Sequence, residues 1–79
     1  QGAIADFDQA IKLKSDFSAA YFMRGNVRYA LGDKQSAIAD YDEAIKLKPD
    51  SASAYHNRGL ARSDLGNHQG ALEDYNQAL

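Results

Sequence analysis

Apolar and small residues recur along this chain at spacings of three and four, which is the period of an amphipathic helix and not of a strand. The first such stripe is formed by Ala3, Ile4, Phe7, Ala10 and Ile11. Similar stripes follow through the rest of the sequence, without strand-like alternation or a low-complexity linker. The pattern predicts five helices, at residues 3–14, 18–31, 34–48, 52–65 and 68–79.

Glycine, proline and short polar residues separate the predicted helices. Gly32 and Gly66 follow the second and fourth helices, where a residue in the left-handed conformation commonly ends a helix. The next residues, Asp33 and Asn67, can cap the following helix through their side-chain oxygens. Pro49 ends the third helix because it cannot continue one. We therefore expect tight turns between antiparallel helices.

The sequence repeats with a period of 34 residues. Shifting the chain against itself by this distance makes more than half of the aligned pairs identical, including Ala3-Ile4-Ala5-Asp6 with Ala37-Ile38-Ala39-Asp40. Each period holds two helices, and those at 18–31 and 52–65 are the first helices of their units. The predicted organisation is a single array. Residues 1–17 hold the second helix of a partial unit, residues 18–51 form a complete unit and residues 52–79 a nearly complete one.

Small and aromatic residues occupy fixed places in each unit. In the complete unit these are Tyr21, Gly25, Ala37, Tyr41, Ala44 and Pro49, and in the last unit they are Tyr55, Gly59, Ala71, Tyr75 and Ala78. With this pattern the sequence resembles tetratricopeptide repeats. The resemblance implies an all-α fold, a right-handed superhelical solenoid of antiparallel helix hairpins, with about two and a third units in this chain. We expect Gly25 to lie against Ala37 where the helices cross. Gly59 should lie against Ala71 in the same way.

Composition excludes several other classes of protein. With 79 residues, 44% of them hydrophobic and 25% charged, the chain is an ordinary globular sequence with room for only a thin core. It has no cysteine, which excludes disulfides, thiolate metal sites and cysteine nucleophiles. The net charge of −2 does not favour nucleic acid as a partner. No apolar run approaches the ~20 residues that span a bilayer, so no membrane partner is expected. The sequence does not indicate a cell compartment.

No catalytic or metal-binding pattern stands out in the sequence. His56 and His68 are the only histidines, and their spacing does not suit a pair of metal ligands. The serines lack a Gly-x-Ser-x-Gly context, and the glycines follow the repeat period and do not form a phosphate-binding loop. We therefore expect no catalytic residue, no metal and no cofactor.

In the first helices, arginine occupies positions at which tetratricopeptide repeats usually have leucine and tyrosine. The arginines of each unit lie one helical turn apart on one face, and they are Arg24, Arg28, Arg58 and Arg62. They could form an anion-binding ladder, or they could pair with the periodic carboxylates Asp6, Asp40 and Asp74. Pairing is favoured because a charge at a packed place is costly without a partner. It predicts that Asp6 lies near Arg24 or Arg28. It likewise predicts that Asp40 lies near Arg58 or Arg62.

The resemblance also implies a function in protein–protein interaction, because the first helices of this family line a concave groove that holds peptides. The residues expected to contact a peptide or protein segment are Phe22, Met23, Asn26, Tyr29, His56, Asn57 and Leu60. Asn26 and Asn57 occupy the asparagine places of a branch that clamps a terminal carboxylate. Phe22 and His56 stand where that clamp needs a lysine, so the carboxylate clamp is not expected. The apolar members of the set could instead pack against a neighbouring helix.

Neither end of the sequence carries the polar capping helix that solenoids need for solubility. The sequence therefore looks like an excerpt of a longer array. Apolar faces left at the ends favour self-association, through Ile4, Phe7, Ile11, Leu72, Tyr75 and Leu79. A self-assembling structural repeat, present as a homo-oligomer or an end-to-end stack, is the alternative to a peptide-binding scaffold.

Overall fold

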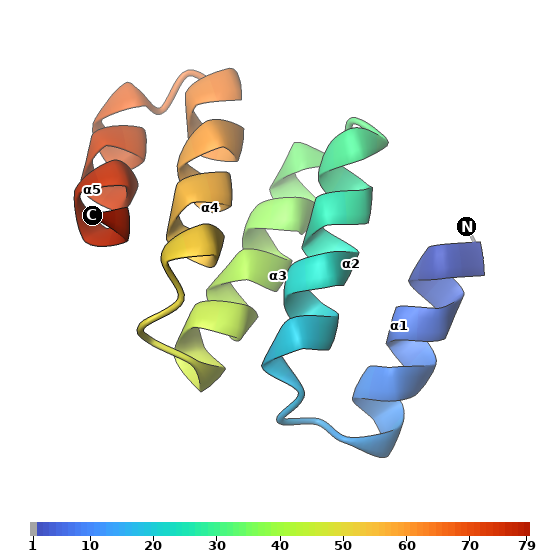
Figure 1. Cartoon of the computed structure of the whole chain (residues 1–79). Helices are drawn as coiled ribbons and strands as arrows, with labels where there is room; N and C mark the ends of the chain where they lie inside the picture. The colour runs from blue at the N-terminus through green and yellow to red at the C-terminus, as the bar shows by residue number, and fades with distance from the viewer. Residues whose placement is uncertain (1) are drawn as a thin grey trace.

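Five α-helices and no strand make up the part of the chain that the computed structural model describes, residues 2–79 (Figure 1). Gln1, the first residue of the predicted partial unit, lies outside the described residues. The helices are α1 (Gly2–Leu13), α2 (Ser18–Ala30), α3 (Lys34–Leu47), α4 (Ala52–Asp64) and α5 (His68–Ala78). All five predicted helices are confirmed, and each boundary lies within one residue of its predicted position.

The predicted helix ends are formed by the expected residues. Gly32 and Gly66 adopt φ values of +89° and +90°, the left-handed conformation that only glycine reaches without strain. The Asp33 carboxylate accepts a hydrogen bond from a backbone N–H in the first turn of α3, and the Asn67 side chain does the same for α5. The Ser51 hydroxyl caps α4 in the same manner. These local features fix where α3, α4 and α5 start and where α2 and α4 stop, whereas α2 starts after Phe17 without a side-chain cap.

Helices that follow one another in the chain pack against one another. The pairs α2–α3 and α4–α5 form antiparallel hairpins, and contact between α3 and α4 joins the two units (Figure 1). The helix α1 packs against α2 as α3 packs against α4, which is the relation expected of a second helix. The helices α2 and α4 also contact each other directly. The result is a thin helical solenoid that measures 35 × 25 × 13 Å.

Small residues dominate the core. Tyr41 is the one large apolar side chain among the described residues that is fully buried, and the other buried apolar residues are Ala20, Ala37, Ala44, Ala54, Ala61 and Ala71. An alanine removes little apolar area from water, so hydrophobic stabilisation per residue is low in this fold. The polar interactions between helices therefore carry more weight than in a larger domain.

The close approach in each hairpin is between a glycine and an aromatic ring. A Cβ atom placed on Gly25 would lie 2.8 Å from a ring carbon of Tyr41, and one placed on Gly59 would lie 2.7 Å from the ring of Tyr75. The requirement for a small residue is therefore confirmed. The side chains nearest to the glycines are not the predicted ones, because the rings lie one helical turn beyond Ala37 and Ala71.

Candidate functional site

Asp40 is buried in the α2–α3 hairpin with only 2% of its surface exposed, and two arginines of α2 neutralise it. Arg24 donates from Nε and Nη2 to its two carboxylate oxygens, at 3.0 and 2.7 Å. Arg28 donates from Nη1 at 3.0 Å. Charge-assisted, bidentate bonds of this kind are the strong ones in proteins, and they satisfy a carboxylate that burial alone would destabilise.

The second unit repeats this arrangement. Asp74 of α5 is as buried as Asp40, and it accepts a bidentate pair of bonds from Arg58 and a further bond from Arg62. No buried side-chain nitrogen or oxygen lacks a hydrogen-bond partner among the residues that the structure describes. The structural interpretation of the arginines is confirmed, because each of the four bonds to a carboxylate. The hydrogen bond between Arg24 and Asp40 also raises the pKa of Arg24. This guanidinium therefore stays charged throughout the accessible pH range.

The partners within this network differ from the predicted ones. Asp40 bonds to the arginines of its own unit and not to Arg58. The bond between units comes from the aspartate two residues later, because Arg58 reaches Asp42 at 2.7 Å. In the same way Arg24 reaches Asp8, at 2.6 Å, and Asp6 pairs with no described residue. Residues two apart on a helix point in different directions, so one aspartate faces its own unit and the other faces the next.

A cavity of about 420 Å³ lies where the start of α4, the middle of α2 and the end of α5 meet. Its lining combines aromatic, small and polar side chains, from Phe22, Ala52, Ser53, His56, Asn57 and Ala78. Three of the predicted peptide contacts therefore meet at one place. Ala52, Ser53 and Ala78 are not among the predicted contacts. The run of small residues where α4 begins is the sequence signal that could have found Ala52 and Ser53, whereas no sequence signal places Ala78, at the end of α5, beside them.

Two asparagines link the first helices beside this cavity. The Asn57 side chain donates from Nδ2 to Oδ1 of Asn26 at 2.9 Å, and the Tyr41 hydroxyl donates to the same oxygen at 2.6 Å. Burial raises the pKa of Tyr41 to about 12, so this hydroxyl keeps its proton at neutral pH. The two bonds fill the acceptor capacity of Asn26 Oδ1. They leave the Asn26 amide N–H groups and the Asn57 carbonyl oxygen without a bond to any described side chain.

The remaining predicted contacts lie outside the cavity. Met23 and Leu60 are exposed apolar side chains on the first helices, with 49% and 37% of their surface accessible. Tyr29 is half-buried near the end of α2, where its hydroxyl donates to Asp64 of α4 and this bond raises the pKa of Tyr29. Two residues of the cavity lining also pack against tyrosines of the second helices. The Phe22 ring lies 5.9 Å from the Tyr41 ring and the His56 ring lies 5.7 Å from the Tyr75 ring, measured between centroids.

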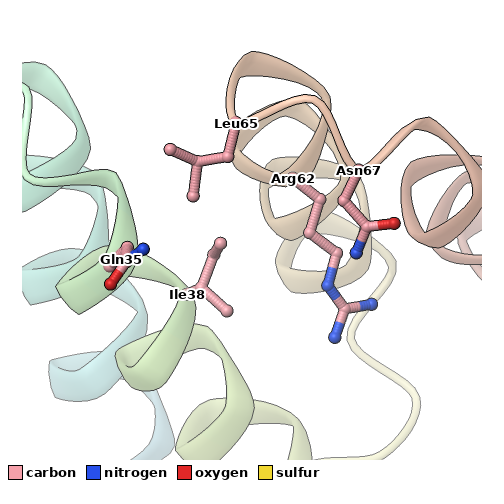
Figure 2. A pocket seen from close by; sticks show the side chains of 5 residues that line it. All are labelled: Gln35, Ile38, Arg62, Leu65 and Asn67. Carbon is pink, nitrogen blue, oxygen red and sulfur yellow. The ribbon is translucent and has the colours of Figure 1, made fainter.

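A second cavity, of about 340 Å³, lies between the two units (Figure 2). Ile38 of α3 and Leu65 at the end of α4 point toward each other across it, while Arg62 and Asn67 form its other side. Two of its three polar side chains are already engaged, because Arg62 bonds to Asp74 and Asn67 caps α5, and the third is Gln35 of α3. This cavity is therefore a gap between packed units and not a second candidate site.

The residues predicted to mediate self-association do not form one surface. Leu72 on α5 and Leu79 after it are exposed, whereas Ile4, Phe7 and Ile11 are half-buried on α1. Tyr75 lies inside the α4–α5 hairpin, against Gly59 and His56, and not at the open end of the array.

Residues 2–79 contain no group of three or more histidine, cysteine, aspartate or glutamate side chains that could hold a metal ion. None of the five described helices is both long and apolar enough to cross a membrane. The surface between α2 and α4, where three of the predicted contacts meet at a cavity, is the candidate site that the geometry offers.

Comparisons with known proteins agree with this architecture. A family model described as TPR repeat matches residues 25–66. A crystal structure of MamA superposes with a TM-score of 0.93 at 31% sequence identity, covering 95% of this chain and 44% of the MamA chain. A further crystal structure of MamA protein gives a TM-score of 0.92 at 32% identity, with 96% and 42% covered. The chain thus spans less than half the length of these MamA chains. No curated protein sequence matches it.

Proposed function

Because this chain belongs to the tetratricopeptide-repeat family, we propose that it is a non-catalytic interaction scaffold that binds a peptide or protein segment in the groove between α2 and α4. Tetratricopeptide repeats generally mediate protein–protein interaction. The residues that define the groove are Phe22, Met23, Asn26, Tyr29, His56, Asn57 and Leu60. The Tyr29 hydroxyl donates to Asp64 and so links α2 to α4.

The observation that carries the proposal is the asparagine pair. Asn26 offers amide N–H donors and Asn57 offers a carbonyl acceptor, and these two kinds of group match the C=O and N–H of a peptide backbone. The bond between the two side chains holds them in one orientation before any ligand arrives, which lowers the entropy cost of binding. An extended segment could therefore bond to the pair without regard to its own side chains.

Apolar contacts around the pair add affinity. The cavity beside Asn57 has room for one side chain of a bound segment, between the rings of Phe22 and His56. Met23 and Leu60 supply exposed apolar surface on the same two helices. Because only two first helices contribute, the interface is small, and we expect affinities on the order of micromolar or weaker.

A peptide selected against the immobilised chain tests the proposal. We expect Asn57→Ala to weaken its binding about tenfold, since a lost hydrogen bond and the loosened Asn26 partner together cost about 1–2 kcal/mol. His56→Ala should weaken it as well. The matched control is Asn76→Ala, which removes an exposed asparagine of α5. Equal binding by the Asn26→Ala, Asn57→Ala and Asn76→Ala chains would show that the ligand site is not this groove.

Self-assembly through the ends is the second candidate function, and the exposed Leu72 of α5 favours it. Leu72 on α5 has 63% of its surface accessible, and Leu79 directly follows this helix. Light scattering over a concentration series measures the outcome directly. We expect Leu72→Gln with Leu79→Gln to shift the mass toward monomer, whereas Leu31→Gln, an exposed leucine in a turn, should not. A wild-type chain that stays monomeric at high micromolar concentration removes this candidate.

A further inference from the structure

Four side chains of α4 form one stripe that faces α2. They are Ser53, Asn57, Leu60 and Asp64, and their spacings of four, three and four residues place them on one side of the helix. Two of them reach α2 directly, because Asn57 donates to Asn26 and Asp64 accepts from the Tyr29 hydroxyl. The stripe therefore runs along the groove, from the cavity at Ser53 to a carboxylate at Asp64.

Asp64 is an exposed carboxylate that has capacity left for a further bond. Its Oδ2 atom accepts from Tyr29, and no described residue donates to its Oδ1 atom. Asp64 also forms no ion pair with a described residue, in contrast to Asp42 and Asp74. The bond to Tyr29 holds the carboxylate beside α2, so its position is set before a ligand arrives.

The positive charges of the two hairpins do not neutralise Asp64. The arginines of α2 and α4 bond to carboxylates of α1, α3 and α5. Lys34, at the start of α3, lies over the Tyr29 ring with Nζ 5.5 Å from the centroid, and it forms no ion pair with a described residue. The seven groove residues include no lysine or arginine. The carboxylate therefore attracts a cation on a bound segment and repels an acidic side chain.

The distance between the cavity and this carboxylate sets the spacing of the ligand side chains that can use both. The α4 wall of the cavity spans Ala52 to Asn57, and its middle lies about nine to ten residues, or about 14 Å of helix, before Asp64. An extended segment rises about 3.3–3.4 Å per residue, so about four residues cover this distance. Side chains four apart in an extended segment point to the same face, whereas side chains three or five apart point to opposite faces. Only the spacing of four therefore turns both side chains toward the groove.

We propose that the groove selects extended segments in which an apolar side chain and a lysine or arginine are four residues apart, in either order along the segment. The apolar side chain enters the cavity between Phe22 and His56, and the cation bonds to Oδ1 of Asp64. The asparagine pair bonds to the backbone of the segment between these two points. This inference rests on the proposed function, because it assigns a partner chemistry to the same groove. Asp64, which is not among the predicted contacts, then determines specificity.

Two synthetic peptides test the spacing. The first is Ac-Thr-Ser-Leu-Ser-Thr-Ser-Lys-Ser-Thr-NH2, and the second has its leucine and lysine exchanged. Amide chemical shifts of the 79-residue chain report both the affinity and the footprint. We expect saturable binding of at least one of the two, with shifts at Phe22, His56 and Asp64. Moving the lysine by one residue, or replacing it with glutamine, should weaken binding about two- to fivefold, and replacing it with glutamate about fivefold or more.

Variants of the chain locate the charge that is recognised. Asp64→Asn keeps an oxygen that accepts from Tyr29 but removes the negative charge, so this chain should bind the lysine and glutamine peptides equally. The matched control is Glu73→Gln, which removes an exposed carboxylate of α5 and should keep the preference for lysine. Lys34→Gln should keep it too. Equal affinities of the wild-type chain for the two peptides would overturn the inference. A preference for lysine that survives in Asp64→Asn would also overturn it.

The inference and the proposed function fail in different ways. If the peptides shift the groove residues regardless of charge and spacing, the inference is overturned and the peptide-binding groove stands. The same holds if neither peptide binds at millimolar concentration while a selected peptide still depends on Asn57. If no peptide, designed or selected, shifts the groove residues, both are overturned.

Discussion

Replacing the buried aspartate of the first hairpin tests how much of the stability of this fold lies in its polar network. Asp40→Asn keeps the shape of the side chain, but it removes the charge and turns one acceptor into an N–H that faces a guanidinium. Three charge-assisted bonds are affected, and each is worth about 1.5–3 kcal/mol when it is considered alone.

We do not expect the loss to equal the sum of the three bond energies, because bonds within one network are not additive and the arginines can form hydrogen bonds to water instead. The side chains of Arg24 and Arg28 keep 17% and 26% of their surface exposed, and Arg24 still has Asp8. We therefore expect a loss of about 3 kcal/mol in the free energy of unfolding. A chain of this length has about 4–12 kcal/mol in total. The melting temperature should accordingly fall by roughly 12–24 °C.

Circular dichroism at 222 nm during thermal and urea unfolding measures this loss. The matched control is Asp42→Asn, which removes an exposed carboxylate with a single bond to Arg58 and should cost about 0–1 kcal/mol. Replacing all three partners, as Asp40→Leu with Arg24→Met and Arg28→Met, should restore much of the stability, because no charge is then left buried. Equal losses for Asp40→Asn and Asp42→Asn would refute the reasoning.

Three further predictions concern backbone, packing and pH. Gly32→Ala should cost about 1 kcal/mol because alanine is strained at a φ of +89°, while Gly2→Ala, with no atom within 4 Å of the new Cβ, should melt like the wild type. Gly25→Ala gains about 1 kcal/mol of helix propensity but places a Cβ 2.8 Å from the Tyr41 ring, so we expect the free energy of unfolding to fall by about 1–2 kcal/mol in total. An unchanged melting temperature would show that the ring moves aside. Burial raises the pKa of Tyr41 to about 12, against about 10 in the unfolded chain, so the folded state holds the hydroxyl proton more tightly. The contribution of this proton to the free energy of unfolding is constant below pH 10. It should be lost between about pH 10 and 12, by about 2 kcal/mol, and urea unfolding of Tyr41→Phe should lack this part of the alkaline decline.

The sequence by itself determined the helices, their ends and the repeat. These depend on contacts between residues close in the chain, such as the caps at Asp33 and Asn67 and the left-handed glycines Gly32 and Gly66. The spacing of apolar positions is equally local, since one face of a helix is fixed by its period. The same spacing showed that the arginines share one face, and the cost of a buried charge showed that they need carboxylates.

The tertiary structure decided which residues meet. Asp6 and Asp8 are both periodic and both acidic, and the sequence could not separate them, because the rotation of α1 against α2 determines which of the two reaches Arg24. The contact of Gly25 with a ring one turn beyond the expected alanine was decided by the offset between the two helices. The bond between Asn26 and Asn57 likewise exists because α2 and α4 lie side by side. Periodicity fixes the face of each helix, but the rotation and offset between helices come from the packing of whole side chains, which no local pattern encodes.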